Sequence, residues 1–241
     1  MDFSWISQIN WGTVGQIILI DVLLGGDNAV VIALACRNLP AAQRRAGILW
    51  GTVGAIILRV ALIAFAVTLL KVPFLKLIGG LLLLWIGVKL LAGEDDGDHQ
   101  VTGADSLWAA VKTIIIADFV MSLDNVIAIA GAAQNTHADH QLAYIIFGLL
   151  VSIPLIVYGS TLVLKLIDKF PVVITAGAAL LGWIAGGLIV TDVAWTNQFG
   201  AASNTFKIIA EIIGAVFVVL FGLYLAKRYK AKAALRDAQP S

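Results

Sequence analysis

The residues that could carry chemistry are acids inside long apolar runs. Asp21 and Asp27 lie in one such run, and Asp118 and Asp124 lie in another. An unpaired carboxylate at the centre of a membrane-spanning helix costs about 2.5–3.5 kcal/mol. Such a group therefore needs a cation, a proton, a basic partner or water beside it, and the four aspartates mark a candidate site for a cation.

The balance of deep charges is negative. Arg59 is the basic residue at the middle of an apolar run, whereas Glu211 adds a fifth acid and has Lys207 four residues before it. Because acids outnumber basic partners, the natural ligand is a cation. We predict that Arg59 and Glu211 are gating residues or charge partners. A structural alternative stays open, in which the aspartates pair with Arg59 or cap broken helices and move nothing.

The donor types favour a hard divalent ion. Asp27 and Asp124 are each followed by an asparagine. Carboxylate, amide and carbonyl oxygens suit Mn²⁺, Mg²⁺ or Ca²⁺, whereas Zn²⁺ and Cu⁺ sites usually contain His or Cys. The single cysteine, Cys36, and the three histidines lie outside the middle of the runs. The ion would be a substrate, and no resident cofactor is expected. The predicted metal ligands are Asp27, Asp124, Asn28, Asn125, Asp21 and Asp118.

Helical spacing separates the two aspartates of each run. Six residues turn an ideal helix by about 600°, so Asp21 and Asp27 lie about 120° apart around the axis. Gly25-Gly26 and, in the other run, Ser122 are places where the helix could open and expose backbone carbonyls. We expect the two Asp-Asn pairs to meet near the membrane midplane. Asp21 and Asp118 would lie one to two turns away, as further ligands or a relay.

The two acidic runs belong to an internal duplication. An offset of 97 residues (118 − 21) sets Asp21 against Asp118 and Gly51 against Gly148. Each copy holds three spans, and because three is odd, the second copy enters the membrane from the opposite side. Such an inverted repeat is typical of alternating-access transporters, whose sites lie near the midplane between the copies.

Composition places the whole chain in the membrane class. The 241 residues are 60% hydrophobic and 13% charged, with a mean hydropathy of +0.96, whereas a soluble domain needs more charge on its surface. We predict an all-α polytopic membrane protein of about seven transmembrane helices, a 3+3 inverted repeat plus one extra helix. Runs long enough to cross the bilayer occur at 12–35, 46–70, 73–92, 107–133, 141–165, 171–191 and 206–226.

The predicted organisation is a single membrane domain over 1–241. Basic residues gather in the loops after the first and fifth spans and in the tail. The positive-inside rule then places the N-terminus outside and the C-terminus in the cytoplasm, with the chain in the cytoplasmic (inner) membrane. We read the first run as a retained helix, and no nucleic-acid partner is expected. The parts are repeat one, 12–92; an acidic linker, 93–106; repeat two, 107–191; a seventh span, 206–226; and a basic tail, 227–241.

The two Asp-Asn motifs resemble a known family. They read Leu24-Gly25-Gly26-Asp27-Asn28-Ala29-Val30-Val31 and Ser122-Leu123-Asp124-Asn125-Val126-Ile127. This pair is similar to the repeated signature of the TerC family of membrane proteins, and the resemblance covers about residues 12–226. It implies a seven-span protein related to LysE-type exporters, in a family whose better understood members are implicated in manganese efflux. It also implies that the acids of the two motifs, here Asp21, Asp27, Asp118 and Asp124, are the metal ligands.

Three functions stay open. The first is a divalent-cation transporter, with Mn²⁺ efflux by alternating access and proton exchange on the same carboxylates. The second is an exporter of a small organic cation or amino acid, which would need a larger and partly apolar pocket. The third is a non-transporting membrane assembly factor. An enzyme is not expected, because the sequence holds no nucleophile–base pair, phosphate loop or HExxH-type motif. A homo-oligomer is compatible with each.

Overall fold

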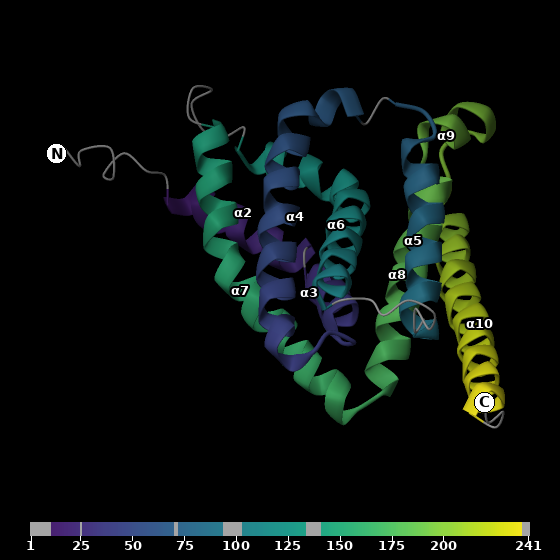
Figure 1. Cartoon of the computed structure of the whole chain (residues 1–241). Helices are drawn as coiled ribbons and strands as arrows, with labels where there is room; N and C mark the ends of the chain where they lie inside the picture. The colour runs from purple at the N-terminus through teal and green to yellow at the C-terminus, as the bar shows by residue number, and fades with distance from the viewer. Residues whose placement is uncertain (1–10, 25, 70–71, 94–102, 134–140, 238–241) are drawn as a thin grey trace.

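The structure is a computed structural model that describes residues 11–24, 26–69, 72–93, 103–133 and 141–237. Within these ranges, the side chains of 22–24, 64, 66–69, 103–105, 124, 126–133, 141–144 and 232–237 are outside the description. The described residues form helices, drawn in Figure 1. These are α2 (Trp11–Leu24), α3 (Gly26–Cys36), α4 (Ala41–Leu69), α5 (Leu75–Ala92), α6 (Gly103–Ala133), α7 (Gln141–Lys169), α8 (Val172–Val190), α9 (Val193–Phe199) and α10 (Asn204–Asp237).

The prediction of a polytopic all-α membrane protein with about seven spans is confirmed. Six of the described helices are long and apolar enough to cross a membrane, and α2 with α3 makes a seventh as a pair bent by 47°. Several helix ends lie outside the predicted runs; for example, α4 begins at Ala41 rather than at 46, and α7 ends at Lys169 rather than at 165. Helix α6 begins at Gly103, inside the predicted linker 93–106, and α10 continues to Asp237, so most of the predicted tail 227–241 is helical. Polar turns extend these helices beyond their apolar runs. The prediction missed these turns because hydropathy detects only the apolar part of a helix.

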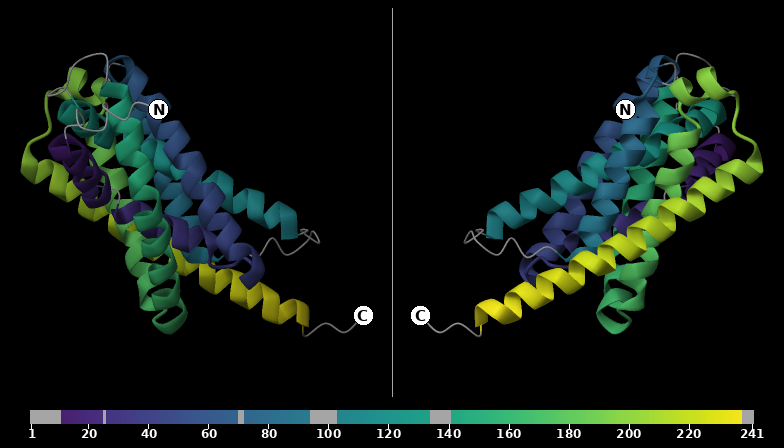
Figure 2. Two further views of the ribbon diagram at one scale, coloured as in Figure 1. Left: turned by 90° about the vertical axis from the view of Figure 1, so that its left-hand side faces the viewer. Right: turned by 90° about the vertical axis from the view of Figure 1, so that its right-hand side faces the viewer.

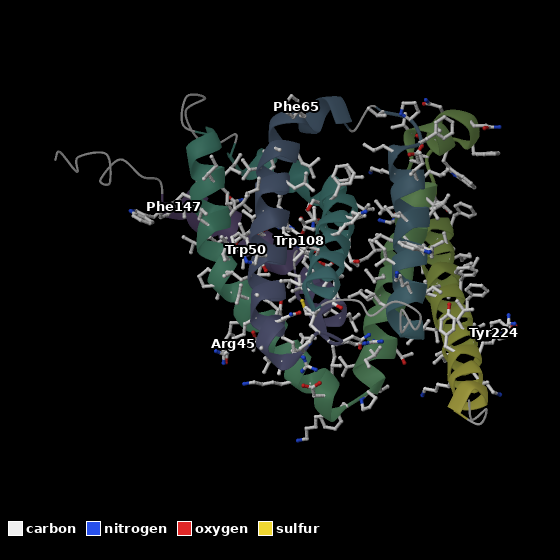
Figure 3. All side chains as sticks on the ribbon, in the orientation of Figure 1. Arg45, Trp50, Phe65, Trp108, Phe147 and Tyr224 are labelled. Carbon is white, nitrogen blue, oxygen red and sulfur yellow. The ribbon has the colours of Figure 1, made fainter. Side chains whose placement is uncertain are left out.

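The helices form two groups that meet along α3 and α6. On one side α4 packs against α6 and α7, and α2 and α3 pack against α7; on the other side α5, α8 and α10 pack together. Figure 2 shows α10 crossing one side of the molecule as a single long helix. A buried apolar cluster from α3, α5, α6 and α8 joins the groups. The side chains of Trp50, Trp108 and Phe147 are exposed, as lipid-facing residues would be, and Figure 3 shows Phe147 pointing away from the bundle.

Two contacts between the repeats are related by the 97-residue offset. Gly51 of α4 faces Ile114 of α6, and a Cβ added to that glycine would lie 2.5 Å from the Ile114 Cδ1. Gly148 of α7 faces Ile17 of α2 in the same way, with 2.6 Å to the Ile17 Cγ2. Each repeat therefore supplies an isoleucine that seats on a glycine of the other repeat.

Asp192 joins the end of α8 to the start of α5. Its fully buried carboxylate caps α9 through the Ala194 N–H at 2.7 Å. It also accepts hydrogen bonds from the backbone N–H groups of Phe74, Lys76 and Leu77, at 2.9, 3.0 and 3.1 Å. These bonds hold the turn in which Phe74 has a left-handed backbone with φ of 66°. Burial raises the pKa of Asp192, but the four N–H donors outweigh it and hold the pKa below its ordinary value.

We expect Asp192→Asn to lower the free energy of unfolding at pH 7 by about 1–2 kcal/mol, because an amide has one acceptor oxygen for four donors. A lowered pKa in the folded state means that the carboxylate stabilises the fold above the unfolded pKa of about 3.9. That stabilisation is lost as the pH falls through the lower folded pKa. Thermal melting in detergent between pH 7 and pH 3 should show the gap between wild type and variant closing on acidification. Parallel curves would contradict the role of the charge.

Candidate cation site

Arg59 lies at the centre of a buried polar cluster. This α4 residue is 1% exposed. Its two terminal guanidinium nitrogens donate to Asp21 of α2 and to Asp118 of α6, one to each carboxylate. Its Nε donates to the Ser122 Oγ at 3.1 Å. The forked guanidinium thus ties together two carboxylates that belong to different repeats. We call Arg59, Asp21, Asp118, Ser122 and Ser152 the Arg59 cluster.

Two serines complete the hydrogen bonding of the two carboxylates. The Ser122 hydroxyl donates to the Asp118 Oδ2 at 3.1 Å, from one turn further along α6. The Ser152 hydroxyl of α7 donates to the Asp21 Oδ2. Both serines are fully buried. A buried ion pair survives without water when its remaining oxygens have donors of this kind.

The Arg59 cluster does not follow the symmetry of the repeat. Asp21 and Asp118 are equivalent at the 97-residue offset, but the position equivalent to Arg59 is Ile156. One positive charge therefore serves two negative charges in this cluster. The excess negative charge lies near the interface of the two repeats.

The Asp27-Asn28 motif lies at the start of α3, just past the break between α2 and α3. Asn28 is 3% exposed, and neither its Oδ1 nor its Nδ2 has a hydrogen-bond partner within the described part of the chain. The Asp27 Oδ1 is likewise buried and unpartnered there. Burying such groups without partners costs about 1–3 kcal/mol each. Native proteins rarely carry this cost without a function, so these atoms are the strongest candidates for direct contact with a ligand.

A layer of polar side chains crosses the bundle at this depth. One buried apolar cluster includes an isoleucine from each of four helices, namely Ile32, Ile48, Ile114 and Ile156. In each of these helices, a buried polar residue lies one helical turn from the isoleucine, on the same face of the helix. These residues are Asn28, Thr52, Asp118 and Ser152. The unpartnered amide of Asn28 therefore lies in the same layer as part of the Arg59 cluster.

A second apolar cluster closes the other side of the polar layer. Asp21, Arg59 and Ser152 each have a member of this second cluster about one turn away, on the side opposite to the first cluster. The buried members are Ile17, Ile56, Leu62, Ile63, Ile145 and Leu149. Two of these, Ile17 and Ile145, are the repeat equivalents of Ile114 and Ile48 in the first cluster. The polar layer is thus enclosed between two apolar clusters that correspond through the repeat.

The predicted ligands fall into different environments. Asp21 and Asp118 both pair with Arg59, which is the pairing of the structural alternative, while Asp27 and Asn28 have side-chain atoms without a partner in the part of the chain that the structure describes. Asn125 is half-buried in α6. The side chain of Asp124 lies outside the described residues. Among the described side chains, no three acids, histidines or cysteines converge as a metal site, so a cation would also need amide, hydroxyl or carbonyl oxygens.

Glu211 does not belong to the Arg59 cluster. It lies between α10 and α8, where its Oε1 is 3.8 Å from the Lys207 Nζ. A Cβ added to Gly187 of α8 would lie 2.9 Å from the same oxygen. The pairing with Lys207 matches the spacing of four residues in the sequence. Its described contacts thus make Glu211 a charge partner within the α8–α10 contact.

Sequence reasoning missed three polar residues of importance. Ser152 and Thr52 are isolated polar residues in apolar runs, where a hydroxyl usually donates a hydrogen bond to a backbone carbonyl of its own helix. Asp192 follows α8 as an ordinary cap, and its bonds to the start of α5 connect residues 118 positions apart. The repeat offers one usable signal, because the 97-residue offset matches Ser152 with Ala55 and Thr52 with Leu149. Polar residues that break the repeat mark places where the two halves differ in chemistry.

Comparisons with known proteins agree with this architecture. Residues 6–230 match the integral membrane protein TerC family. The chain is 43% identical over 208 residues to the uncharacterized membrane protein YjbE of Bacillus subtilis (strain 168), covering 86% of this chain and 92% of that protein. It is 27% identical over 186 residues to YceF of the same organism, covering 73% and 70% of the two chains. It is 31% identical over 153 residues to the inner membrane protein YgdQ of Escherichia coli (strain K12), covering 56% and 65%. No solved structure matches. The chain is therefore an integral multi-pass membrane protein that belongs to the TerC family.

Proposed function

We propose that this protein carries a divalent metal cation across the membrane, with Mn²⁺ leaving the cytoplasm as the principal substrate. The observation that carries the proposal is the set of buried, unpartnered polar atoms of Asp27 and Asn28, in a layer that holds excess negative charge. Oxygen donors of these types suit Mn²⁺, Mg²⁺ and Ca²⁺. The preference for Mn²⁺ and for efflux rests on the likeness to the TerC family.

The charge balance supports a divalent ion. With every group ionised, Asp21, Asp27 and Asp118 carry three negative charges against the one positive charge of Arg59. Among the described side chains, the two excess negative charges equal the charge of one divalent cation or of two protons; Asp124, whose side chain lies outside the description, would add a further negative charge. Exchange of the metal for protons on the same carboxylates would keep the polar layer close to neutral in both states, which matters because uncompensated charge inside a membrane is costly.

Alternating access supplies the route. The apolar cluster around Ile114 closes the end of the bundle that holds the α3–α4 turn, the α7–α8 turn and the C-terminus (Figure 1). Basic residues gather at this end, including Arg44, which pairs with Asp168 at 3.1 Å, so we place this end in the cytoplasm and the N-terminus outside. Opening of the Ile114 cluster would admit the ion, and opening of the Ile17 cluster would release it. Arg59 stands between Asp27 and the outer cluster as a fixed positive charge.

The test is Mn²⁺ uptake into proteoliposomes under a range of pH gradients. Wild type should take up Mn²⁺, and Asp27→Asn and Asp124→Asn should each reduce the initial rate to that of protein-free liposomes. Asp168→Asn is the matched control, because this acid is exposed at the end of α7, and it should keep the wild-type rate. If wild type moves no divalent ion, the proposal fails. An organic cation or amino acid substrate, or an assembly role, would then be tested instead.

A further inference from the structure

Thr52 of α4 has a hydroxyl that the fold does not use. The residue is 1% exposed, and its Oγ1 has no hydrogen-bond partner among the residues that the structure describes. A threonine inside a helix normally donates to the carbonyl one turn back. Other described hydroxyls do so at 2.8–2.9 Å, namely those of Thr113, Ser160, Thr161 and Thr191. Thr52 is thus oriented differently and carries an unmet polar atom in the interior.

The placement of Thr52 links it to the Asp27-Asn28 motif. Ile32 of α3 and Ile48 of α4 belong to the same apolar cluster. The chain reverses between them through the short turn 37–40. Asn28 is one turn from Ile32 and Thr52 is one turn from Ile48, both in the direction away from that turn. The two unpartnered side chains therefore lie in one layer, on helices that face the same apolar cluster.

We propose that the Thr52 hydroxyl is a ligand of the transported cation, together with the Asp27 carboxylate and the Asn28 amide oxygen. This inference rests on the proposed transport function and adds a donor to its site. The three groups offer one charged and two neutral oxygens from two helices, a set that suits a hard divalent ion. At the 97-residue offset, Leu149 is the residue equivalent to Thr52, so the second repeat supplies no equivalent hydroxyl. The cation site is consequently asymmetric.

The experiment measures Mn²⁺ affinity in detergent, from the rise in melting temperature with Mn²⁺ concentration, and Mn²⁺ uptake in proteoliposomes. Thr52→Val keeps the shape of the side chain but removes the donor oxygen, and should raise the Kd for Mn²⁺ about tenfold or more. Thr52→Ser keeps the oxygen and should stay within about twofold of wild type. Without metal, Thr52→Val should melt at or above the wild-type temperature, because it removes an unpartnered buried hydroxyl.

Thr161→Val is the matched control, since the Thr161 hydroxyl already donates to the Val157 carbonyl at 2.8 Å, and it should leave the Kd unchanged. If wild type binds and transports Mn²⁺ and Thr52→Val does so equally well, the ligand role of Thr52 is wrong and the transport function stands. A Thr52→Val protein that melts lower without metal but keeps its Kd also overturns the ligand role, in favour of a structural one. If wild type neither binds nor moves Mn²⁺, Mg²⁺ or Ca²⁺, both proposals fall.

Discussion

Arg59→Met is expected to lower the free energy of unfolding by about 3–5 kcal/mol, because it leaves the Asp21 and Asp118 carboxylates buried without their shared positive partner. Methionine fills most of the same space, so the loss would come from charge. Arg59→Lys should recover only part of the stability, since a single ammonium group cannot donate to both carboxylates with the forked geometry of the guanidinium. Thermal melting of the purified protein in detergent gives the comparison.

The control for this prediction replaces all three charged residues of the Arg59 cluster with neutral ones. Arg59→Met combined with Asp21→Asn and Asp118→Asn removes all three charges, and should melt within a few degrees of wild type. We expect this triple variant to fold and yet to lack Mn²⁺ uptake, because Asp27 alone of the three described carboxylates remains and leaves too little negative charge for a divalent ion. If Arg59→Met alone melts like wild type, the two carboxylates do not depend on Arg59 and the description of the cluster is wrong.

Gly186→Ala is expected to cost about 3 kcal/mol, at the upper end of the range for overpacking. The added Cβ would lie 2.2 Å from the Ala210 carbonyl oxygen of α10. Cβ atoms added to Gly182 and Gly214 would lie 2.3 and 2.1 Å from the carbonyl oxygen of the other glycine, so α8 and α10 touch along their main chains as small-residue motifs allow. Backbone cannot move aside as a side chain can, and α10 would have to shift away as a whole.

Gly15→Ala provides the comparison within the same molecule. Gly15 lies in α2, and apart from the backbone of α2 itself no described atom lies within 4 Å of its added Cβ. The substitution should stabilise that helix by about 1 kcal/mol at most, because alanine favours the helix over glycine. Melting temperatures of the two alanine variants should therefore move in opposite directions. Equal shifts would mean that α8 and α10 are not in backbone contact.

The sequence predicts the spans well, because a run of apolar residues must become a helix in lipid. It also locates the break at Gly25-Gly26, where α2 ends and α3 begins. It does not show that the equivalent part of α6 stays continuous. There Ser122 remains within the helix and binds Asp118 and Arg59. Whether a helix opens at such a point depends on partners from other helices.

The roles of the aspartates could be foreseen only as alternatives. Asp21 and Asp27 have the same residue type and lie in the same apolar run, so their sequence context is alike. Their difference arises because Arg59 and Ser152, which are distant in sequence, bond to Asp21, whereas the Asp27 Oδ1 has no hydrogen-bond partner among the described residues. Asp192 shows the same limit, since its bonds to the start of α5 form only when α8 has packed beside α5.

The exchanged contacts, Ile114 on Gly51 and Ile17 on Gly148, have a consequence for how such a chain arose. Within one repeat, the isoleucine and the glycine do not contact each other. Two copies inserted in opposite orientations would form both isoleucine–glycine contacts. Contacts exchanged in this way are of the kind that an antiparallel homodimer of one repeat would form. An ancestor of that kind would hold either two arginines or none at the positions of Arg59 and Ile156. A single arginine between two equivalent aspartates therefore requires two halves that differ in sequence, which one chain can hold and a pair of identical chains cannot.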